Sequence, residues 1–83
     1  GAIFDGGVVL EAGARAHRGA SITGSVLLEG AEAAPGSLLW QTVVMPGTRV
    51  PPGTAFRDGV VLADPDDASG RVHCVPFADL EGP

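Results

Sequence analysis

Apolar residues, most of them large, recur along most of the chain at intervals of six, six and five residues. The series is Leu10, Ala16, Ile22, Leu27, Ala33, Leu39, Val44, Val50, Phe56 and Val61. Small residues form a second series, two positions before each next member: Ala14, Ala20, Ser25, Ala31, Ser37, Thr42, Thr48, Thr54 and Gly59. Because the two series alternate three times in every seventeen residues, the pattern predicts a triangular prism whose coils each contain three short strands.

The repeat is visible without gaps when segments 10–26, 27–43 and 44–60 are aligned. Glycines occupy two columns of this alignment: Gly13, Gly30 and Gly47 in one, Gly19, Gly36 and Gly53 in the other. A proline precedes three of them, at Pro35, Pro46 and Pro52. Glycine and proline suit sharp bends of the backbone, so these columns predict two corners of the prism.

From about Ala2 to Leu62, these residues resemble the hexapeptide-repeat family, whose members form left-handed parallel β-helices. The left hand comes from the resemblance alone, since the general rule for parallel crossovers favours the right hand. We therefore predict an all-β fold: a left-handed parallel β-helix of about three full coils with a partial N-terminal coil and an irregular C-terminal tail. The β-helix is expected over residues 1–63, and a cap or tail over residues 64–83.

Both ends of the chain depart from the repeat. Phe4 lies six residues before Leu10, and Val8 fills the small position between them, so the chain starts within a coil. We therefore expect a fragment, or a chain capped by another polypeptide. At the other end, the residues of 64–67 predict a turn that ends the prism. The apolar residues of 72–80 then provide surface for a short strand or a cap.

One wall of the predicted prism is apolar on its outer side. Side chains alternate along a strand, so the neighbours of Leu10, Leu27, Val44 and Val61 point outward. They are Val9, Val26, Val43 and Val60 on one side, and Glu11, Leu28, Met45 and Leu62 on the other. Strands that are apolar on both sides are typical of sheets covered on both faces. The cover would be another subunit, a domain outside this chain, or the tail.

Residues seventeen apart should stack about 4.8 Å from one another on successive coils. Arg15, Glu32 and Arg49 then form an outward column of alternating charge, which helps to fix the register. In a second column, Arg57 is placed to lie over the indole of Trp40. The alternative is that Trp40 contacts a partner. The predicted interface residues are Val26, Leu28, Val43, Met45, Val60, Leu62 and Trp40.

Ten acidic residues oppose five basic ones, which gives a net charge of −5 without any lysine. This charge repels phosphate backbones and anionic lipids, so it argues against nucleic-acid or membrane partners. The single cysteine, Cys74, has no internal disulfide partner, and a reducing cytoplasm is the expected compartment.

The sequence predicts no catalytic residues, no cofactor and no metal site. Asp64, Asp66 and Asp67 are interpreted as a solvated acidic turn. His17 is a weak alternative: in the acyltransferase branch of the family a histidine at a subunit boundary is the general base, which the resemblance extends to His17 if a partner completes the site. Carbonic anhydrases of this fold bind zinc through three histidines, and this chain has two, His17 and His73.

Within the family, the runs at 25–31 and 42–54 look most like the C-terminal β-helix of sugar-phosphate nucleotidyltransferases. The resemblance implies a domain for subunit contact, which in some members also serves allosteric control. The Rossmann-like catalytic domain of those enzymes has no counterpart here, so no catalytic residue carries over. We expect a non-catalytic domain for oligomerisation or domain packing. The alternatives are a subunit of a hexapeptide-repeat acyltransferase with its site at a trimer boundary, and a free-standing structural oligomer.

Overall fold

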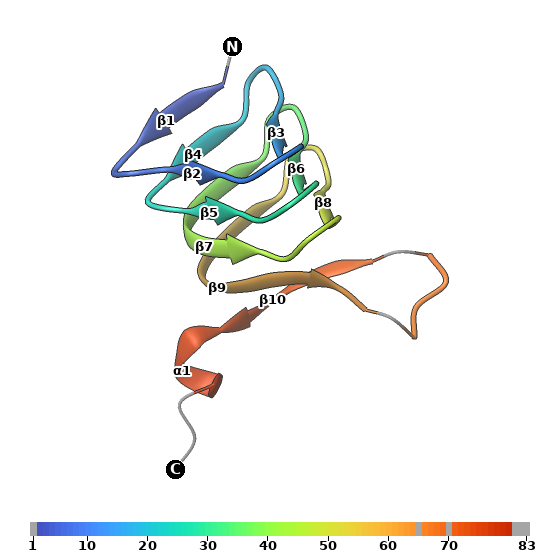
Figure 1. Ribbon diagram of the computed structural model, residues 1–83. Helices are drawn as coiled ribbons and strands as arrows, with labels where there is room; N and C mark the ends of the chain where they lie inside the picture. The colour runs from blue at the N-terminus through green and yellow to red at the C-terminus, as the bar shows by residue number, and fades with distance from the viewer. Residues whose placement is uncertain (1, 65, 70, 81–83) are drawn as a thin grey trace.

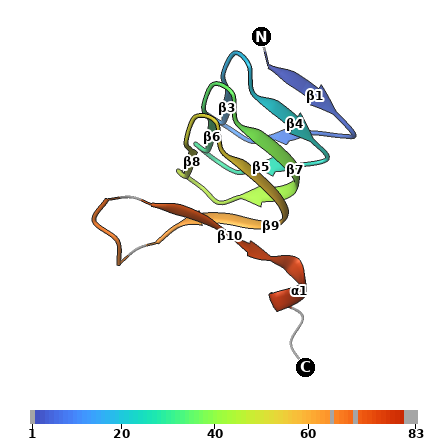
Figure 2. The same ribbon diagram turned by 180° about the vertical axis from the view of Figure 1, so that it is seen from behind.

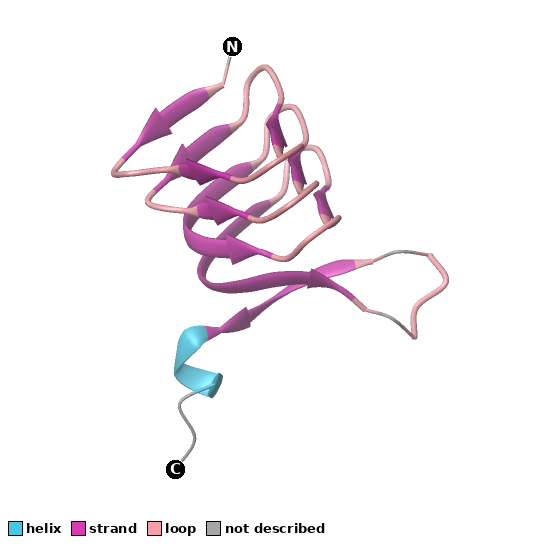
Figure 3. Cartoon of the chain, in the orientation of Figure 1, coloured by secondary structure: helices cyan, strands magenta, loops and turns pink. Residues whose placement is uncertain are grey.

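The computed structural model describes residues 2–64, 66–69 and 71–80, and its chain winds into a parallel β-helix. Short strands and a single helical turn account for its regular structure (Figures 1 and 3). They are β1 (Ile3–Asp5), β2 (Val9–Leu10), β3 (Arg15–Ala16), β4 (Ser21–Thr23), β5 (Val26–Leu27), β6 (Glu32–Ala33), β7 (Leu38–Val44), β8 (Arg49–Val50), β9 (Ala55–Ala63), β10 (Val72–Pro76) and α1 (Phe77–Leu80).

Three walls enclose the prism. The first wall contains β1, β4 and the first halves of β7 and β9. The second contains β2, β5 and the second halves of β7 and β9, and the third contains β3, β6 and β8. All these pairs are parallel. In Figure 1 the chain descends leftward along β1, crosses the front through β2 and returns past β3 to β4 at the back, and Figure 2 shows β1 and β4 from that side. This path is a left-handed coil, as predicted.

Neighbouring coils keep the seventeen-residue register that the sequence predicts, with Leu10 beside Leu27 and Leu27 beside Val44. The first wall begins differently, because Phe4 pairs with Ile22, one residue further along than the repeat requires. The extra residue lies at the first corner, where Gly6 and Gly7 stand in place of a single residue in the later coils. The flexibility of two glycines lets the additional residue bend out without disturbing the strands.

The predicted interior is confirmed. Leu27, Leu39 and Val50 share one core in which each is 0 % exposed. The small series also points inward: Ser25, Ser37 and Thr42 are at most 1 % exposed. Their polar groups are satisfied locally, since the Ser37 hydroxyl donates to the Ala34 carbonyl at 2.7 Å, and the Thr42 N–H donates to Ser25 Oγ at 3.0 Å. Small side chains are needed at these positions because three walls converge on a narrow interior.

The two predicted glycine columns lie at corners with positive φ, for example 72° at Gly30 and 76° at Gly36. The third corner also needs positive φ, yet it is occupied by three different residues, Gly24, Gln41 and Asp58. Gln41 and Asp58 both have φ of 53°, a region that side chains with a Cβ enter at a cost. The third corner therefore has the same geometry as the others without their sequence signature.

The tail adds a strand to the end of the prism. β10 pairs antiparallel with β9, and its residues Val72 and Cys74 pack against the core of the β-helix. Before it, the predicted turn is present: the Asp67 N–H donates to the Asp64 carbonyl at 3.1 Å, while Pro65 of the predicted turn lies outside the described residues. The sequence allowed either a short strand or a cap after this turn. The structure has a strand, which is followed by the single helical turn α1.

Candidate interaction surface

The outer side of the second wall carries the predicted apolar surface, which we call the apolar face. Register pairing aligns Val9 with Val26, Val26 with Val43, and Val43 with Val60 across successive strands. These valines point outward, because side chains alternate along a strand and the next residues, Leu27, Val44 and Val61, point into the core and are 0 % exposed. The apolar face comprises Val9, Val26, Leu28, Val43, Met45, Val60 and Leu62.

Exposure of the apolar face varies along the prism. Val9 in the first coil is 51 % exposed and Met45 is 38 % exposed, while Val26, Val43 and Val60 are half-buried by their neighbours. Each valine lies opposite the valine of the next strand, so the row is a continuous apolar strip and not a set of separate side chains.

The tail extends the apolar face and does not lie over it. In the antiparallel pairing of β10 with β9, Val75 is opposite Val60 and His73 is opposite Leu62. Side chains opposite one another in an antiparallel pair share a face of the sheet, so Val75 continues the valine row by one strand. Within the described residues the tail therefore does not cover the apolar face, and the other two covers, another subunit or a domain outside this chain, stay predictions.

Ionisable side chains lie only at the margins of this surface within the described residues. Glu11 follows β2 at the first coil and His73 lies on the last strand, whereas the strands between them present valine, leucine and methionine. An uncharged centre with a polar rim is the arrangement found in interfaces between proteins. The side chains of the apolar face carry no ionisable group, so they offer apolar contact area and no proton-transfer chemistry.

Trp40, the remaining predicted interface residue, lies on the first wall and is not brought together with the others. The Arg57 guanidinium carbon is 5.2 Å from the centre of the Trp40 ring, which confirms the predicted stacking. Arg57 Nε is also 3.4 Å from Asp58 Oδ2. A shallow groove of about 240 Å³ beside this pair is lined by Leu38, Trp40, Ala55, Phe56 and Arg57.

His17, the weak catalytic candidate, lies on the third wall. Its Nε2 is 3.5 Å from Glu32 Oε1, and Glu32 Oε2 is 3.8 Å from Arg49 Nε. The predicted charge column is present in the register, with Glu32 between Arg15 and Arg49. The sequence did not predict the histidine contact, although His17 lies two residues beyond Arg15 and is thus a diagonal neighbour of Glu32.

The remaining candidate groups do not form a site. Among residues 2–64, 66–69 and 71–80, no group of three or more His, Cys, Asp and Glu side chains is placed to hold a metal ion. Burial raises the pKa of the Cys74 thiol, which lies 3.6 Å from the Arg57 carbonyl. Hydrogen bonds from the Ser69 hydroxyl and N–H lower the pKa of Asp67, as in an ordinary exposed turn.

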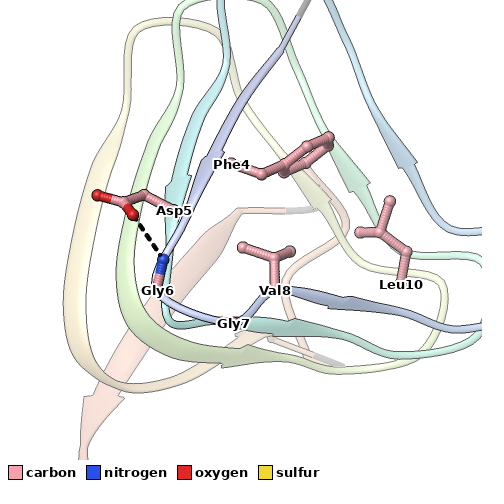
Figure 4. A pocket seen from close by; sticks show the side chains of 6 residues that line it. All are labelled: Phe4, Asp5, Gly6, Gly7, Val8 and Leu10. Carbon is pink, nitrogen blue, oxygen red and sulfur yellow. Dashed lines mark hydrogen bonds between the residues drawn. The ribbon is translucent and has the colours of Figure 1, made fainter.

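A hollow of about 320 Å³ opens at the N-terminal end of the prism (Figure 4). Phe4, Val8 and Leu10 project into it from the first coil, and Gly6 and Gly7 complete its rim. The inward positions that the sequence predicted for Phe4 and Val8 are confirmed. Asp5, the charged residue at the rim, accepts a hydrogen bond from the Gly6 N–H at 2.8 Å.

Sequence reasoning did not find the extension of the apolar face by β10. The alternation of Val72, Cys74 and Pro76 with His73 and Val75 is the available signal, but it spans one short strand that does not follow the repeat. No helix in the described part of the chain is long and apolar enough to cross a membrane. No protein-family model matches the chain, and neither a curated protein nor a solved structure matches it significantly.

Proposed function

We propose that this β-helix is a non-catalytic packing module that holds a subunit or a neighbouring domain on its apolar face. The observation that carries the proposal is the valine row, which lies in register from Val9 to Val60 on a wall whose inner side is already buried in the core. Burying apolar surface stabilises an assembly by about 25 cal/mol per Å². A sheet that is apolar on both sides is typically covered on both of its faces, by the core on one side and by a partner on the other.

The resemblance to sugar-phosphate nucleotidyltransferases suggests in which kind of enzyme the packing module would work. In that setting the module follows a catalytic domain that joins a nucleotide to a sugar 1-phosphate, and it works in the cytoplasm. The fold is compatible with this role, and the apolar face is the part of the chain that would carry it. The proposed contribution is contact between subunits or domains, with the chemistry located in the catalytic domain.

A charge placed in the apolar face tests the proposal. Met45→Glu adds a carboxylate on the same face as Val43, directly after β7, at a position that is 38 % exposed and therefore has room for it. We expect unchanged far-ultraviolet circular dichroism and a lower mass by sedimentation, because the carboxylate would lose its hydration on assembly. Leu38→Glu, at a 46 % exposed position on the first wall, is the matched control and should leave the mass unchanged. Equal masses for Met45→Glu and the parent chain would contradict the contact between subunits, and of the proposed partners only a neighbouring domain would then be left for the apolar face.

One observation favours a second candidate function, acyl transfer across a subunit boundary. Glu32 lies 3.5 Å from His17, and a carboxylate beside an imidazole orients it as a general base. Under this alternative, the chain should release free thiol from a thioester donor when an amine or hydroxyl acceptor is present. His17→Gln should abolish the release and Glu32→Gln should reduce it, whereas thiol release that is insensitive to both substitutions would reject His17 as the base.

A further inference from the structure

A second row of side chains lies beside the valine row on the second wall. Its register continues from coil to coil, since the N–H groups of Glu11, Leu28 and Met45 donate to carbonyls of the following coil at 2.9, 3.0 and 2.9 Å. His73 of β10 lies opposite Leu62 and ends the row. We call Glu11, Leu28, Met45, Leu62 and His73 the mixed row. It is apolar in the middle, with a carboxylate at one end and an imidazole at the other.

The two ends of the mixed row have no ion-pair partner within residues 2–64, 66–69 and 71–80. Glu11 and His73 are both exposed, and none of the ion pairs in that part of the chain includes either residue. Four strand spacings of about 4.8 Å separate them, so they cannot reach each other within one chain. The wall therefore presents a hydrogen-bond acceptor and a donor at opposite ends of an apolar strip.

We propose that the apolar face binds the apolar face of a second copy of this chain, with the two prisms antiparallel. The inference rests on the proposed function, because it names the partner of that same surface. The twofold axis lies in the interface along the second half of β7, the middle strand of the wall. It places each row over the same row of the other copy in reverse order. Glu11 then faces His73 of the partner subunit, and this contact occurs twice by symmetry.

The order of the side chains along the wall points to a second copy as the partner. Reversal exchanges the two ends of the mixed row and leaves its apolar middle in place, while valines face valines along the other row. An imidazole N–H can donate to a carboxylate in either protonation state of the ring. Facing sheets lie about 10 Å apart, a gap that a glutamate and a histidine can bridge together. A surface that complements its own reverse is what an isologous twofold contact requires.

A second twofold axis would also align the rows, but it gives a poorer contact. This axis runs along the prism, so it keeps the coils in step and exchanges the two rows. Glu11 would then face Val9 of the partner subunit and lose its hydration without gaining a hydrogen bond, which costs free energy. The antiparallel arrangement avoids this cost. It also keeps the two Glu11 carboxylates at opposite ends of an interface between two chains that each carry a net charge of −5.

The contact is narrow, because five strands contribute two rows of side chains each. The strip is about 19 Å long between its outer strands, and it is smaller than the surface of about 800 Å² per partner that stable interfaces bury. We therefore expect a reversible dimer whose average mass rises with concentration.

Exchanging the charges at the two ends tests the arrangement. Glu11→Arg should raise the dissociation constant measured by sedimentation about tenfold, because it places a cation against His73 at both ends of the dimer. His73→Glu should raise it by a similar factor, because two carboxylates would then face each other. The double variant Glu11→Arg/His73→Glu should restore the parent value. Arg18→Glu, at an exposed position outside the second wall, is the control for net charge and should leave the dissociation constant unchanged.

Restoration by the double variant is a readout that folding alone does not give. The two positions are too far apart in one chain to interact, so their effects should add unless they meet between copies. Chemical crosslinking checks the same contact in a Cys74→Ala background. A mixture of Glu11→Cys and His73→Cys chains should be joined by a short bismaleimide linker, whereas either variant alone should be joined much less.

The outcomes separate this arrangement from the proposed function. A parent assembly that Met45→Glu dissociates, but that the double variant fails to restore, would overturn the antiparallel dimer and leave the apolar face as a packing surface. A parent chain that stays monomeric at every concentration would also overturn the dimer, and a neighbouring domain would then be the partner left for the apolar face.

Discussion

Gly59→Ala tests how the tail strand is held on the β-helix. Gly59 lies in β9 opposite Pro76 of β10, and a Cβ added there would meet the Val75 carbonyl oxygen, and also the Cys74 sulfur at 2.6 Å. A Cβ essentially never lies this close to a non-bonded atom, so β10 has to move. Overpacking of this kind costs about 1–3 kcal/mol.

This overpacking should weaken the attachment of β10 to β9 and leave the stability of the prism unchanged. In the described part of the chain β10 is an edge strand that pairs with β9 alone, and such elements open with a smaller free energy than the core. A loss of about 1–3 kcal/mol corresponds to roughly 5- to 150-fold more frequent opening. Release of β10 would expose Cys74 and remove the burial that raises its pKa, so more thiolate would be present at pH 8.

The assay is the rate at which Cys74 reacts with an aromatic disulfide reagent, together with amide exchange over β10. We expect the rate of Cys74 reaction and the rate of amide exchange in β10 both to rise roughly 5- to 150-fold. Circular dichroism should retain the β-helix signal. Gly47→Ala is the control: its φ of 69° makes alanine strained, but no atom lies within 4 Å of the added Cβ. It should lower the overall stability without a selective increase at Cys74. An unchanged Cys74 rate in Gly59→Ala would refute the steric argument.

Three further predictions concern the prism and the tail. Leu39→Ala should lower the free energy of unfolding in urea by about 2–5 kcal/mol because the side chain is 0 % exposed, whereas Leu38→Ala, at a 46 % exposed position, should change it by less than about 0.5 kcal/mol. Gly36→Ala should cost about 1–2 kcal/mol in the same assay, since its φ is 76°. Because the pKa of Cys74 is raised in the folded chain, its contribution to stability is complete below the ordinary thiol pKa and is lost as the pH rises through the raised value. Thermal unfolding between neutral and alkaline pH should therefore show a decline that is absent in Cys74→Ala.

The interior of the fold was predictable because it repeats. Positions such as Leu27, Leu39 and Val50 must be apolar in every coil. Because this pattern occurs three times along the sequence, only one register of the coils places all these residues inside. The third corner was not predictable. This corner requires positive φ, which Gly24 adopts easily and which Gln41 and Asp58 adopt at a modest energetic cost. Because the three residues are of different types, the sequence gives no common signal for the corner.

The candidate surface was predictable only in part. Its valine row follows from the alternation of side chains on strands whose inner positions were already assigned. Its extension by Val75 depends on the pairing of β10 with β9, a contact that reverses the chain direction and has no counterpart in the repeat. The contact between His17 and Glu32 is a diagonal one: the spacing makes the two residues neighbours, and their rotamers decide whether the side chains meet.

The most direct measurement of the central claim is the solvent exposure of the apolar face in the assembled protein. Methyl groups of Val43, Val60 and Met45 are compared by nuclear magnetic resonance in the presence of a soluble paramagnetic probe. Val44, which is 0 % exposed, and Leu80, which is 59 % exposed, are the internal standards. The packing module predicts that the three methyl groups relax as slowly as those of Val44. Relaxation of Met45 and Val43 as fast as that of Leu80 would contradict it.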